Sequence, residues 1–570
     1  MTLQLPIERS EFGSAWADSL ASLMVRLHES QGGRAKHSIR IAGLTRDLCS
    51  ALDSGNSCLS HDRLEKIEDY HSPIIVTADE ALNRVAPLVL EQSRLYLYRY
   101  WFDEYQLAQA IKQLKRPLAV SLTEQQLKRL VADTKVLQAH AIHVALQQGL
   151  TLITGGPGTG KTFTLVRILM ALLQQNSQLN VALAAPTGKA AARMQEALRI
   201  SLSKAETPLA MDLLSALPNT AFTLHRLLGM GHGTKAQFNA DNPLPYDVVI
   251  IDEASMIDLR MAAQLFAAIA PSARLILLGD ANQLAAVEAG AVLSEITTAK
   301  SLHGCRVQLT ESMRFKDNSG IGQLAIAICA GDAEQTIQLL KANQHDVCYQ
   351  PIDQPELMLE QLFQGYLNNS NDSVETSHPS FVSTLQQQQN ITAILLAFDR
   401  FRVLCAVREG TYGVLSINQR LGMLLQHALG QDIDPTQKWF RGRPVMVTQN
   451  DYTLGVFNGD IGITMEEEGE FYVYFPARDG EPMRVAAARL AHTETALALT
   501  IHKSQGSEFN HVAVVLPKED TPILTRELIY TGITRAKEKI SIWGQESLMI
   551  KAVQRKTQRA SGLQVKLDQD

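Results

Sequence analysis

LTLITGGPGTGKT, residues 150–162, joins an apolar segment, a glycine-rich loop and the start of a helical pattern in one stretch. Its spacing fits the G-x-x-x-x-G-K-T template, in which glycines let backbone N–H groups turn toward phosphate oxygens. We therefore predict a loop in which Lys161 reaches the β- and γ-phosphates of a nucleotide and the Thr162 hydroxyl binds Mg²⁺. The other loop residues that would surround the phosphates are Gly155, Gly156, Pro157, Gly158, Thr159 and Gly160.

An acidic pair, Asp252-Glu253, follows a second short apolar run, DVVII at residues 247–251. A carboxylate that emerges from the end of a buried strand can hold Mg²⁺ opposite a threonine hydroxyl, so Asp252 is a predicted metal ligand. Its neighbour Glu253 is predicted to polarise the attacking water. The order and spacing of this pair after Lys161 favour the catalytic interpretation over a solvated turn.

Four further residues are candidates for nucleotide contact. An arginine that neutralises charge on the γ-phosphate accelerates hydrolysis, and Arg314 in LTESMRF and Arg535 in YTGITRAKEK are placed to do so. Gln283, in LLGDANQL, could sense the γ-phosphate by hydrogen bonding. Gln138, upstream of the glycine-rich loop, is a candidate for contact with the adenine edge.

The rest of the chain repeats short apolar runs rich in Val, Ile and Leu, separated by helical patterns. Such runs are typical of parallel strands buried on both faces, with helices on either side. We predict two α/β lobes, residues 116–315 and 316–570. Their strands are expected at residues 150–154, 181–185, 248–251, 275–278 and 307–309, and at 402–407, 512–516 and 540–543.

Three regions depart from this pattern. Residues 1–115 lack a nucleotide motif and are predicted to be mostly helical. Residues 366–390 are polar and are predicted to form a surface loop. Residues 443–490 contain short strand-like runs separated by the turn dipeptides Asn458-Gly459 and Asp479-Gly480, which predicts a small β-barrel inserted in the second lobe.

Composition limits the class of protein. The chain has 570 residues, a net charge of −6, 45% hydrophobic and 20% charged residues, which excludes a wholly basic nucleic-acid coat but allows a local basic groove. There is no signal pattern and no apolar run long enough for a membrane span. The six cysteines form no CxxC pair, which disfavours a metal cluster. We expect a cytoplasmic protein without membrane contact.

Taken together, the motifs resemble superfamily 1 DNA helicases and, more closely, the RecD family, the alpha subunits of bacterial exonuclease V (RecBCD). The shared motifs, in chain order, are GGPGTGKT, APTGKAAARM, TLHRLLG, IIDEASMID, LLGDANQL, SMRF, LTIHKSQGSEF and YTGITRAKEK. The narrower likeness rests on SGIGQLA, CAVREGTYGV, RPVMVTQND, LGVFNGDIG and TRELIYT, between residues 319 and 531. It is strong over about residues 120–563 and faint before that.

The resemblance implies two RecA-like lobes, an SH3-like barrel insert, and an ATP- and Mg²⁺-dependent 5′→3′ translocase on single-stranded DNA. It also implies work at duplex ends in a heterotrimer, beside a RecB-like helicase-nuclease and a RecC-like scaffold subunit. Residues 1–115, which hold no site of their own, are then predicted to be a docking domain for these subunits, and the alternative is that they only brace the first lobe. By motif, Gln283, Arg314 and Arg535 would contact the γ-phosphate, and Gly506 and Glu508 would approach the nucleotide from the second lobe. The implied DNA contacts are Thr187, Gly188, Thr223, His225, Thr500, His502 and Lys503, with Tyr412, Tyr452 and Phe457 as candidate base-stacking residues.

Two alternative functions remain open. The first is a stand-alone helicase of the same subfamily, although residues 1–115 lack the helix-hairpin-helix repeats expected there. The second is an ATPase that switches the conformation of a DNA-repair complex without net unwinding, which the intact catalytic positions disfavour. Under any of these functions we expect this chain alone to degrade no DNA, because it has no acidic-lysine cluster of the nuclease type.

Overall fold

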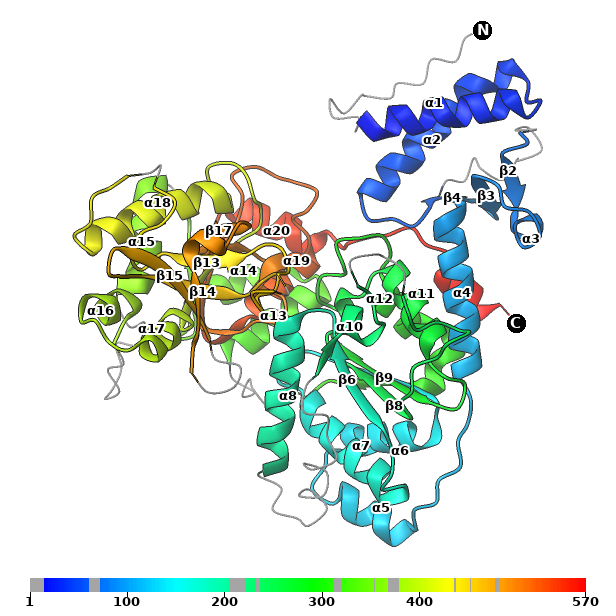
Figure 1. Ribbon diagram of the computed structural model, residues 1–570, viewed down its shortest axis with the longest axis horizontal. Helices are drawn as coiled ribbons and strands as arrows, with labels where there is room; N and C mark the ends of the chain where they lie inside the picture. The colour runs from blue at the N-terminus through cyan, green and yellow to red at the C-terminus, as the bar shows by residue number, and fades with distance from the viewer. Residues whose placement is uncertain are drawn as a thin grey trace.

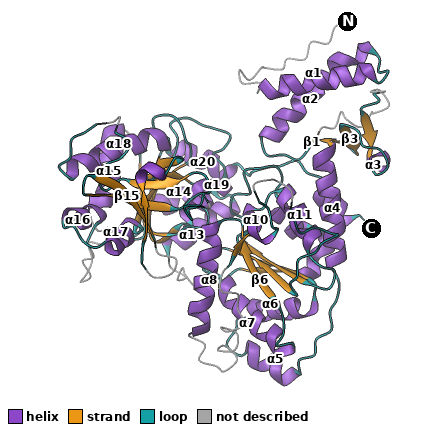
Figure 2. Ribbon diagram, in the orientation of Figure 1, coloured by secondary structure: helices purple, strands orange, loops and turns teal. Residues whose placement is uncertain are grey.

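The computed structural model describes residues 15–60, 72–203, 221–231, 236–311, 319–352, 354–367, 379–434, 437–451, 453–476 and 481–569. Two α/β lobes lie side by side, and the N-terminal helices stand at one end of the first lobe (Figures 1 and 2). Within the described ranges, no helix combines the length and apolar character needed to cross a membrane.

The N-terminal region combines helices with a small sheet. Helices α1 (Ala15–Ser30) and α2 (Ser38–Asp53) pack on each other, which confirms the predicted helical character. The sheet, in the order β1-β4-β3-β2, was not predicted because strands of two to four residues carry almost no alternation. Its strands are β1 (Leu59–Ser60), β2 (Ile75–Thr77), β3 (Leu88–Glu91) and β4 (Arg94–Leu97), with α3 (Ala78–Ala81) after β2.

The first lobe is built on a parallel sheet with the order β10-β5-β9-β8-β6-β7. Its strands are β5 (Leu150–Gly155), β6 (Val181–Ala185), β7 (Phe222–Thr223), β8 (Val248–Ile251), β9 (Arg274–Gly279) and β10 (Arg306–Leu309), which confirms the runs predicted for this lobe. Alternate strand residues enter different cores: Leu152 lies in one cluster and Ile153 in another, so helices cover both faces. The helices are α5 (Glu124–Val131), α6 (Val136–Gln147), α7 (Lys161–Gln175), α8 (Gly188–Ser203), α10 (Leu224–Leu227), α11 (Leu259–Ala268) and α12 (Val292–Thr298).

The second lobe repeats this plan with a parallel sheet in the order β11-β20-β19-β12-β18. The strands are β11 (Val347–Gln350), β12 (Phe401–Cys405), β18 (Ala498–Thr500), β19 (Phe509–Val515) and β20 (Ala536–Trp543). They include the three runs predicted for this lobe. The helices are α13 (Gly320–Ala330), α14 (Ala333–Lys341), α15 (Pro355–Leu367), α16 (Phe381–Gln386), α17 (Ile391–Phe398), α18 (Val414–Ala428), α19 (Arg526–Ile533) and α20 (Glu546–Gln554).

The prediction of a surface loop over residues 366–390 is wrong in part. Helix α16 occupies residues 381–386, and it buries Phe381, Val382 and Leu385 in the second-lobe core. Those three apolar side chains recur at helical spacing inside an otherwise polar stretch, which is too short for a clear period. Residues 368–378 of the predicted loop lie outside the described residues.

An antiparallel sheet in the order β16-β15-β14-β13-β17 stands where the barrel insert was predicted. Its strands are β13 (Pro444–Val447), β14 (Ile461–Glu467), β15 (Glu470–Phe475), β16 (Met483–Ala486) and β17 (Thr493–Thr495). The expected strands are present, and Gly459 adopts φ 91°, as its turn dipeptide predicts. Closure of this sheet into a barrel stays a prediction.

The last fifteen residues leave the second lobe and return to the first. Helix α21 (Leu563–Asp568) packs on α4 (Tyr98–Leu114), and the C-terminus lies beside α4 in Figure 1. Leu563 and Leu567 enter the same core as Leu107 of α4 and Leu152 of β5. Helix α4 therefore packs as part of the first lobe, although the predicted docking domain of residues 1–115 includes it.

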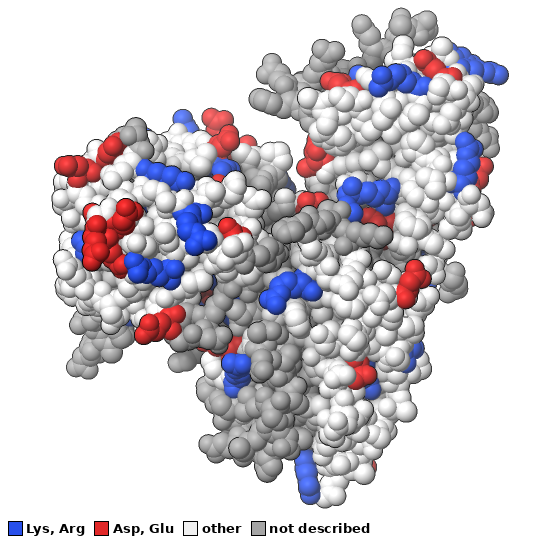
Figure 3. Space-filling model, viewed as in Figure 1, with Lys and Arg blue, Asp and Glu red and all other residues white. Residues whose placement is uncertain are grey.

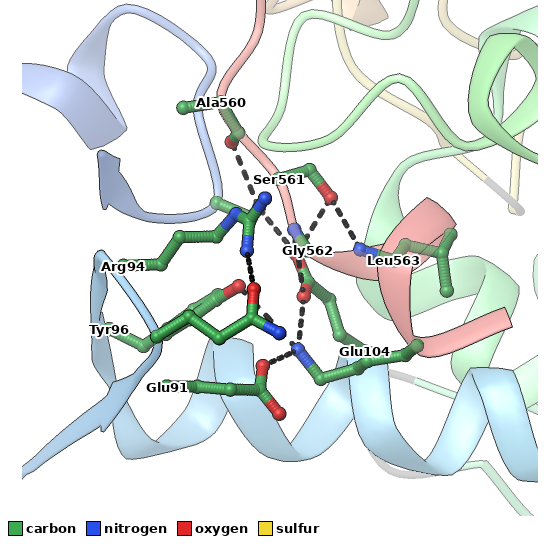
Figure 4. A network of polar contacts seen from close by, with 11 residues as sticks. Glu91, Arg94, Tyr96, Glu104, Ala560, Ser561, Gly562 and Leu563 are labelled. Carbon is green, nitrogen blue, oxygen red and sulfur yellow. Dashed lines mark hydrogen bonds and ion pairs between the residues drawn. The ribbon is translucent and has the colours of Figure 1, made fainter. Parts of the chain in front are cut away.

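A buried polar network holds this C-terminal segment in place (Figure 4). Lys566 Nζ lies 2.9 Å from a carboxylate oxygen of Glu104 and is also paired with Glu91. Glu104 is fully buried and accepts further hydrogen bonds from the hydroxyls of Ser57 and Ser561, at 2.6 and 2.8 Å. Buried charges of this kind are tolerated only when paired and hydrogen-bonded, so the network fixes the position of the segment.

We expect Lys566→Ala to destabilise the protein by about 3 kcal/mol, because it leaves the Glu104 carboxylate buried without its cation. The measurement is the midpoint of thermal unfolding. Lys128→Ala is the matched control, since Lys128 is 73% exposed in its pair with Glu124 and should change stability by less than about 0.5 kcal/mol. Equal midpoints for the two variants would contradict the assignment of Lys566 as a structural anchor.

Candidate nucleotide site and DNA track

The glycine-rich loop lies between β5 and α7, as its sequence predicts. Gly158 and Gly160 adopt φ values of 76° and 83°, a left-handed conformation that side chains other than glycine rarely adopt. The ammonium of Lys161 donates to the carbonyl oxygens of Gly155 and Gly156, at 2.7 and 3.1 Å. The loop's own backbone thus holds the ammonium, and Thr162 follows Lys161 in the first turn of α7.

The acidic pair lies at the end of β8. The backbone N–H of Glu253 donates to the Asp252 carboxylate at 2.8 Å, and Glu253 itself has φ 52°. Burial, reinforced by the charge of Glu253, raises the pKa of Asp252 to about 6, while Lys161 acts in the opposite sense. The carboxylate that precedes the turn is therefore close enough to the loop lysine for their charges to interact.

Asp280 is a third acidic group at this edge, and it was not predicted as a site residue. It follows β9, is 2% exposed, and accepts hydrogen bonds from the Asn282 N–H and the Gln283 amide at 3.0 and 3.1 Å. Burial raises its pKa, and Lys161 opposes this effect. Its position at the end of a buried strand, which is also that of Asp252, is the signal that could have identified it.

The second lobe brings Arg535 to the same place. This guanidinium is 2% exposed and donates to the carbonyl oxygens of Thr531 and Ser507, both at 3.2 Å. Burial lowers its pKa, whereas the nearby carboxylates of Glu253 and Glu508 raise it. The charges of Arg535 and Glu253 therefore act on each other across the boundary between the lobes.

Gly506 and Glu508 also face the first lobe. Glu508 forms an ion pair with Arg193 of α8, and Arg193 also donates to the Gly506 carbonyl at 3.4 Å. Gly506 has φ 71°, and a Cβ added there would lie 3.4 Å from the Cβ of Ala190. The loop that carries these residues thus rests directly on α8.

Gln138 lies beside the phosphate loop. Its side-chain oxygen accepts from the Lys135 N–H at 3.1 Å, and its amide nitrogen would lie 2.6 Å from a Cβ added to Gly160. Arg314, the other predicted arginine, falls outside the described residues.

A cavity of about 1000 Å³ adjoins the loop and opens between the lobes. Its first-lobe wall includes Gly156, Thr159 and Asp280, and its second-lobe wall includes Gln323 and Tyr530. The predicted nucleotide residues Lys161, Asp252, Glu253 and Arg535 are not among the residues that line it. A cavity of this size could hold a nucleotide, and polar groups from both lobes converge on it.

The first-lobe residues implied for DNA contact lie together. Thr187 caps α8 by accepting from the Ala190 N–H at 3.2 Å, and Thr223 caps α10 by accepting from the Arg226 N–H at 3.3 Å. A Cβ added to Gly188 would lie 3.9 Å from the methyl of Thr223 and 3.8 Å from Phe457. His225 is exposed in the first turn of α10.

The second-lobe residues form a separate turn after β18. The Lys503 N–H donates to the Thr500 hydroxyl at 3.2 Å, and its ammonium lies 3.3 Å from Glu494. His502 is half-buried, and burial, aided by Arg559, lowers its pKa. The two sets approach each other at Gly506, where an added Cβ would lie 3.9 Å from the Thr187 hydroxyl.

Of the aromatic candidates, Phe457 alone adjoins this track among the described residues. Tyr412 packs against the second-lobe core, and Tyr452 lies outside the described residues. On the face shown in Figure 3, acidic and basic side chains are interspersed, so a DNA contact there would depend on local groups.

Comparison with known proteins identifies the family. Residues 138–289 match the model of an AAA domain, and residues 495–542 match a UvrD-like helicase C-terminal domain. The RecBCD enzyme subunit RecD of Mycobacterium tuberculosis is 39% identical, over 93% of this chain and 91% of its own length. The RecD subunit of Haemophilus influenzae is 34% identical over 87% and 84%, and the ATP-dependent RecD2 DNA helicase of Deinococcus radiodurans is 30% identical over 72% and 49%.

The match to the Mycobacterium tuberculosis subunit covers 93% of the chain and therefore extends over most of both lobes. It agrees with a fold in which two α/β lobes meet at a nucleotide-sized cavity. The chain belongs to the RecD family of RecBCD enzyme subunits, and it is an ATP-dependent DNA helicase subunit.

Proposed function

We propose that this chain is the 5′→3′ single-strand DNA translocase and helicase of a cytoplasmic exonuclease V complex. In that complex it works beside a RecB-like helicase-nuclease and a RecC-like scaffold subunit, and unwinds DNA at double-strand breaks for recombinational repair. One observation carries the proposal: Arg535 of the second lobe is buried, and Thr531, whose carbonyl oxygen accepts from its guanidinium, also accepts from the Leu284 N–H of the first lobe. An arginine that must cross between lobes to reach the nucleotide couples hydrolysis to lobe closure.

ATP and Mg²⁺ would bind at the phosphate loop. Oxygen ligands suit Mg²⁺, and the Thr162 hydroxyl and Asp252 carboxylate supply them on either side of Lys161. The metal would neutralise phosphate charge during hydrolysis. Lys161 would exchange its two carbonyl partners for phosphate oxygens, and Glu253 would orient and deprotonate the attacking water.

The remaining nucleotide contacts would form as the lobes close. Gln283, Arg314 and Arg535 would contact the γ-phosphate, and Gly506 and Glu508 would approach it from the second lobe. Gln138, which lies beside Gly160, would contact the nucleotide at the other end of the loop.

Single-stranded DNA would cross both lobes. Thr187, Gly188, Thr223 and His225 would contact it from the first lobe, and Thr500, His502 and Lys503 from the second. Small hydroxyls, helix N-termini and a few cations suit contact with the phosphate backbone, independent of sequence. The short approach between Gly506 and Thr187 supports a track that is continuous across the lobe boundary.

The same motor could also act as a stand-alone helicase. The match to RecD, at 39% identity over 549 residues, exceeds the match to RecD2, at 30% over 415 residues, and favours the subunit. A third candidate, an ATPase switch without unwinding, is disfavoured because the described catalytic positions are intact.

We expect the purified chain to consume ATP while moving on single-stranded DNA, and to be stopped by a block at the 3′ end but not at the 5′ end. Stopped-flow translocation on strands blocked at either end measures this. Lys161→Ala is the matched inactive variant and should retain less than about a tenth of the wild-type ATPase rate, because it lacks the phosphate-binding cation. Arrest at the 5′ block would contradict the proposed 5′→3′ direction of translocation.

We expect Arg535→Ala to slow DNA-stimulated ATP hydrolysis by about 10³-fold and to change ATP affinity much less. The reason is that an arginine acting on developing charge stabilises the transition state more than the bound substrate. Steady-state kinetics and nucleotide binding are compared with those of Arg420→Ala, an arginine 39% exposed in the same lobe. Affinity that falls in step with rate would indicate a ground-state role.

The N-terminal domain would provide the docking surface for the other subunits. It holds exposed apolar side chains, among them Ile39 in α2 at 87% and Val85 after α3 at 76%. A stable heteromeric interface buries about 1,600 Å² in total, and exposed apolar groups are its usual centre.

We expect Ile39→Asp to weaken co-purification with RecB-like and RecC-like subunits while leaving DNA-dependent ATP hydrolysis intact, because a buried carboxylate at an interface has no partner. Leu396→Asp, on a residue 61% exposed in α17, is the control and should assemble normally. Normal assembly of the Ile39 variant, together with that of Val85→Asp, would contradict docking through this face.

A further inference from the structure

A hydrogen bond between buried side chains joins the two lobes beside the nucleotide cavity. The hydroxyl of Tyr530, in α19 of the second lobe, donates to the Asp280 carboxylate of the first lobe at 2.9 Å. Both residues line the cavity, and their exposures are 5% and 2%. The same hydroxyl would lie 2.9 Å from a Cβ added to Gly156, so it touches the phosphate loop as well.

The end of α19 makes further contacts with the same first-lobe loop. Thr531 accepts from the Leu284 N–H at 2.9 Å, and its carbonyl accepts from the Arg535 guanidinium. Gln505, on another second-lobe loop, donates to the Leu284 carbonyl at 2.9 Å. Loop 280–284 is therefore held by the same helical turn that positions Arg535.

Asp280 also holds the side chain of Gln283 by a hydrogen bond. The Oδ2 atom of Asp280 accepts from both the Tyr530 hydroxyl and the Gln283 amide. The Gln283 side-chain oxygen is buried and has no hydrogen-bond partner within the described residues. The charged and titratable groups that act on Asp280, or that Asp280 acts on, are Lys161 of α7, Cys329 of α13, Tyr530 and Arg535.

We infer that Tyr530 is a positioning residue for ATP hydrolysis: its hydroxyl fixes Asp280, and through it Gln283, only while the lobes are closed. This inference rests on the proposed ATP-dependent function. A merely structural role is the alternative, in which the buried ring stabilises the second lobe and the hydroxyl only satisfies a hydrogen bond. Phenylalanine keeps the ring and removes the hydroxyl, so it separates the two.

The test compares Tyr530→Phe with Tyr366→Phe in the full-length chain. Tyr366 is a fully buried tyrosine of the same lobe, and its hydroxyl donates to the Leu497 carbonyl, within the α15 region of the core. We expect Tyr530→Phe to lower kcat of DNA-stimulated ATP hydrolysis about ten-fold, with KM for ATP and the affinity for a fluorescent ATP analogue changed less than about two-fold. Tyr366→Phe should shift the midpoint of thermal unfolding by about as much as Tyr530→Phe does, but it should leave kcat unchanged.

A second arm tests the route through Gln283. If Tyr530 acts by positioning Gln283, adding Tyr530→Phe to a Gln283→Ala variant should lower kcat by less than about two-fold. An undiminished effect in that background, or a single variant with wild-type kcat, would overturn the inference. Failure of the proposed function is distinct, because the wild-type chain would then show no DNA-stimulated hydrolysis at all.

Discussion

Strand β5 pairs with β9, and β9 with β8, in parallel, so the three strands end at one edge of the first sheet. Nearly all residues of these strands are buried, so their backbone groups depend on the ladder for hydrogen bonds. The phosphate loop, Asp252 and Asp280 each follow one of the three strands. Their proximity is therefore a consequence of the pairing, and the lobe boundary, the cavity and the approach of Arg535 are all arranged about this edge.

Buried charge explains why the lobes are coupled. Asp280, Arg535 and Tyr530 are nearly inaccessible, although each carries a group that water would otherwise solvate. Such groups are stable at a boundary only while they are hydrogen-bonded. Opening the lobes would break the hydrogen bond between Tyr530 and Asp280 and return both groups to water, and closing the lobes would restore it. The boundary can therefore exist in two states whose balance a charged ligand would shift.

The C-terminal segment adds a covalent connection across the same boundary. Arg555 is fixed to the second lobe by hydrogen bonds to Arg526 and Asp520, whereas Arg559 donates to the Gly290 carbonyl of the first lobe. The chain thus crosses between lobes within four residues. Lys566 and Glu104 then fix its end beside the N-terminal sheet, so that the N-terminal region, α4 and the C-terminal segment meet at one buried network.

The sequence by itself determined the features that depend on neighbouring residues. Short apolar runs predicted the strands of both parallel sheets, and the fixed spacing around Lys161 and the position of Asp252 at a strand end predicted a nucleotide site whose residue roles stay predictions. The tertiary structure alone decided that Asp280 meets Tyr530, that α4 packs with the first lobe, and that Lys566 pairs with Glu104. The residues of each of these two pairs lie 250 or more positions apart in the sequence. The sequence of α4 shows an apolar face but not that this face packs into the core of the first lobe. A local pattern specifies which face of an element is apolar, but long-range packing selects what lies against it.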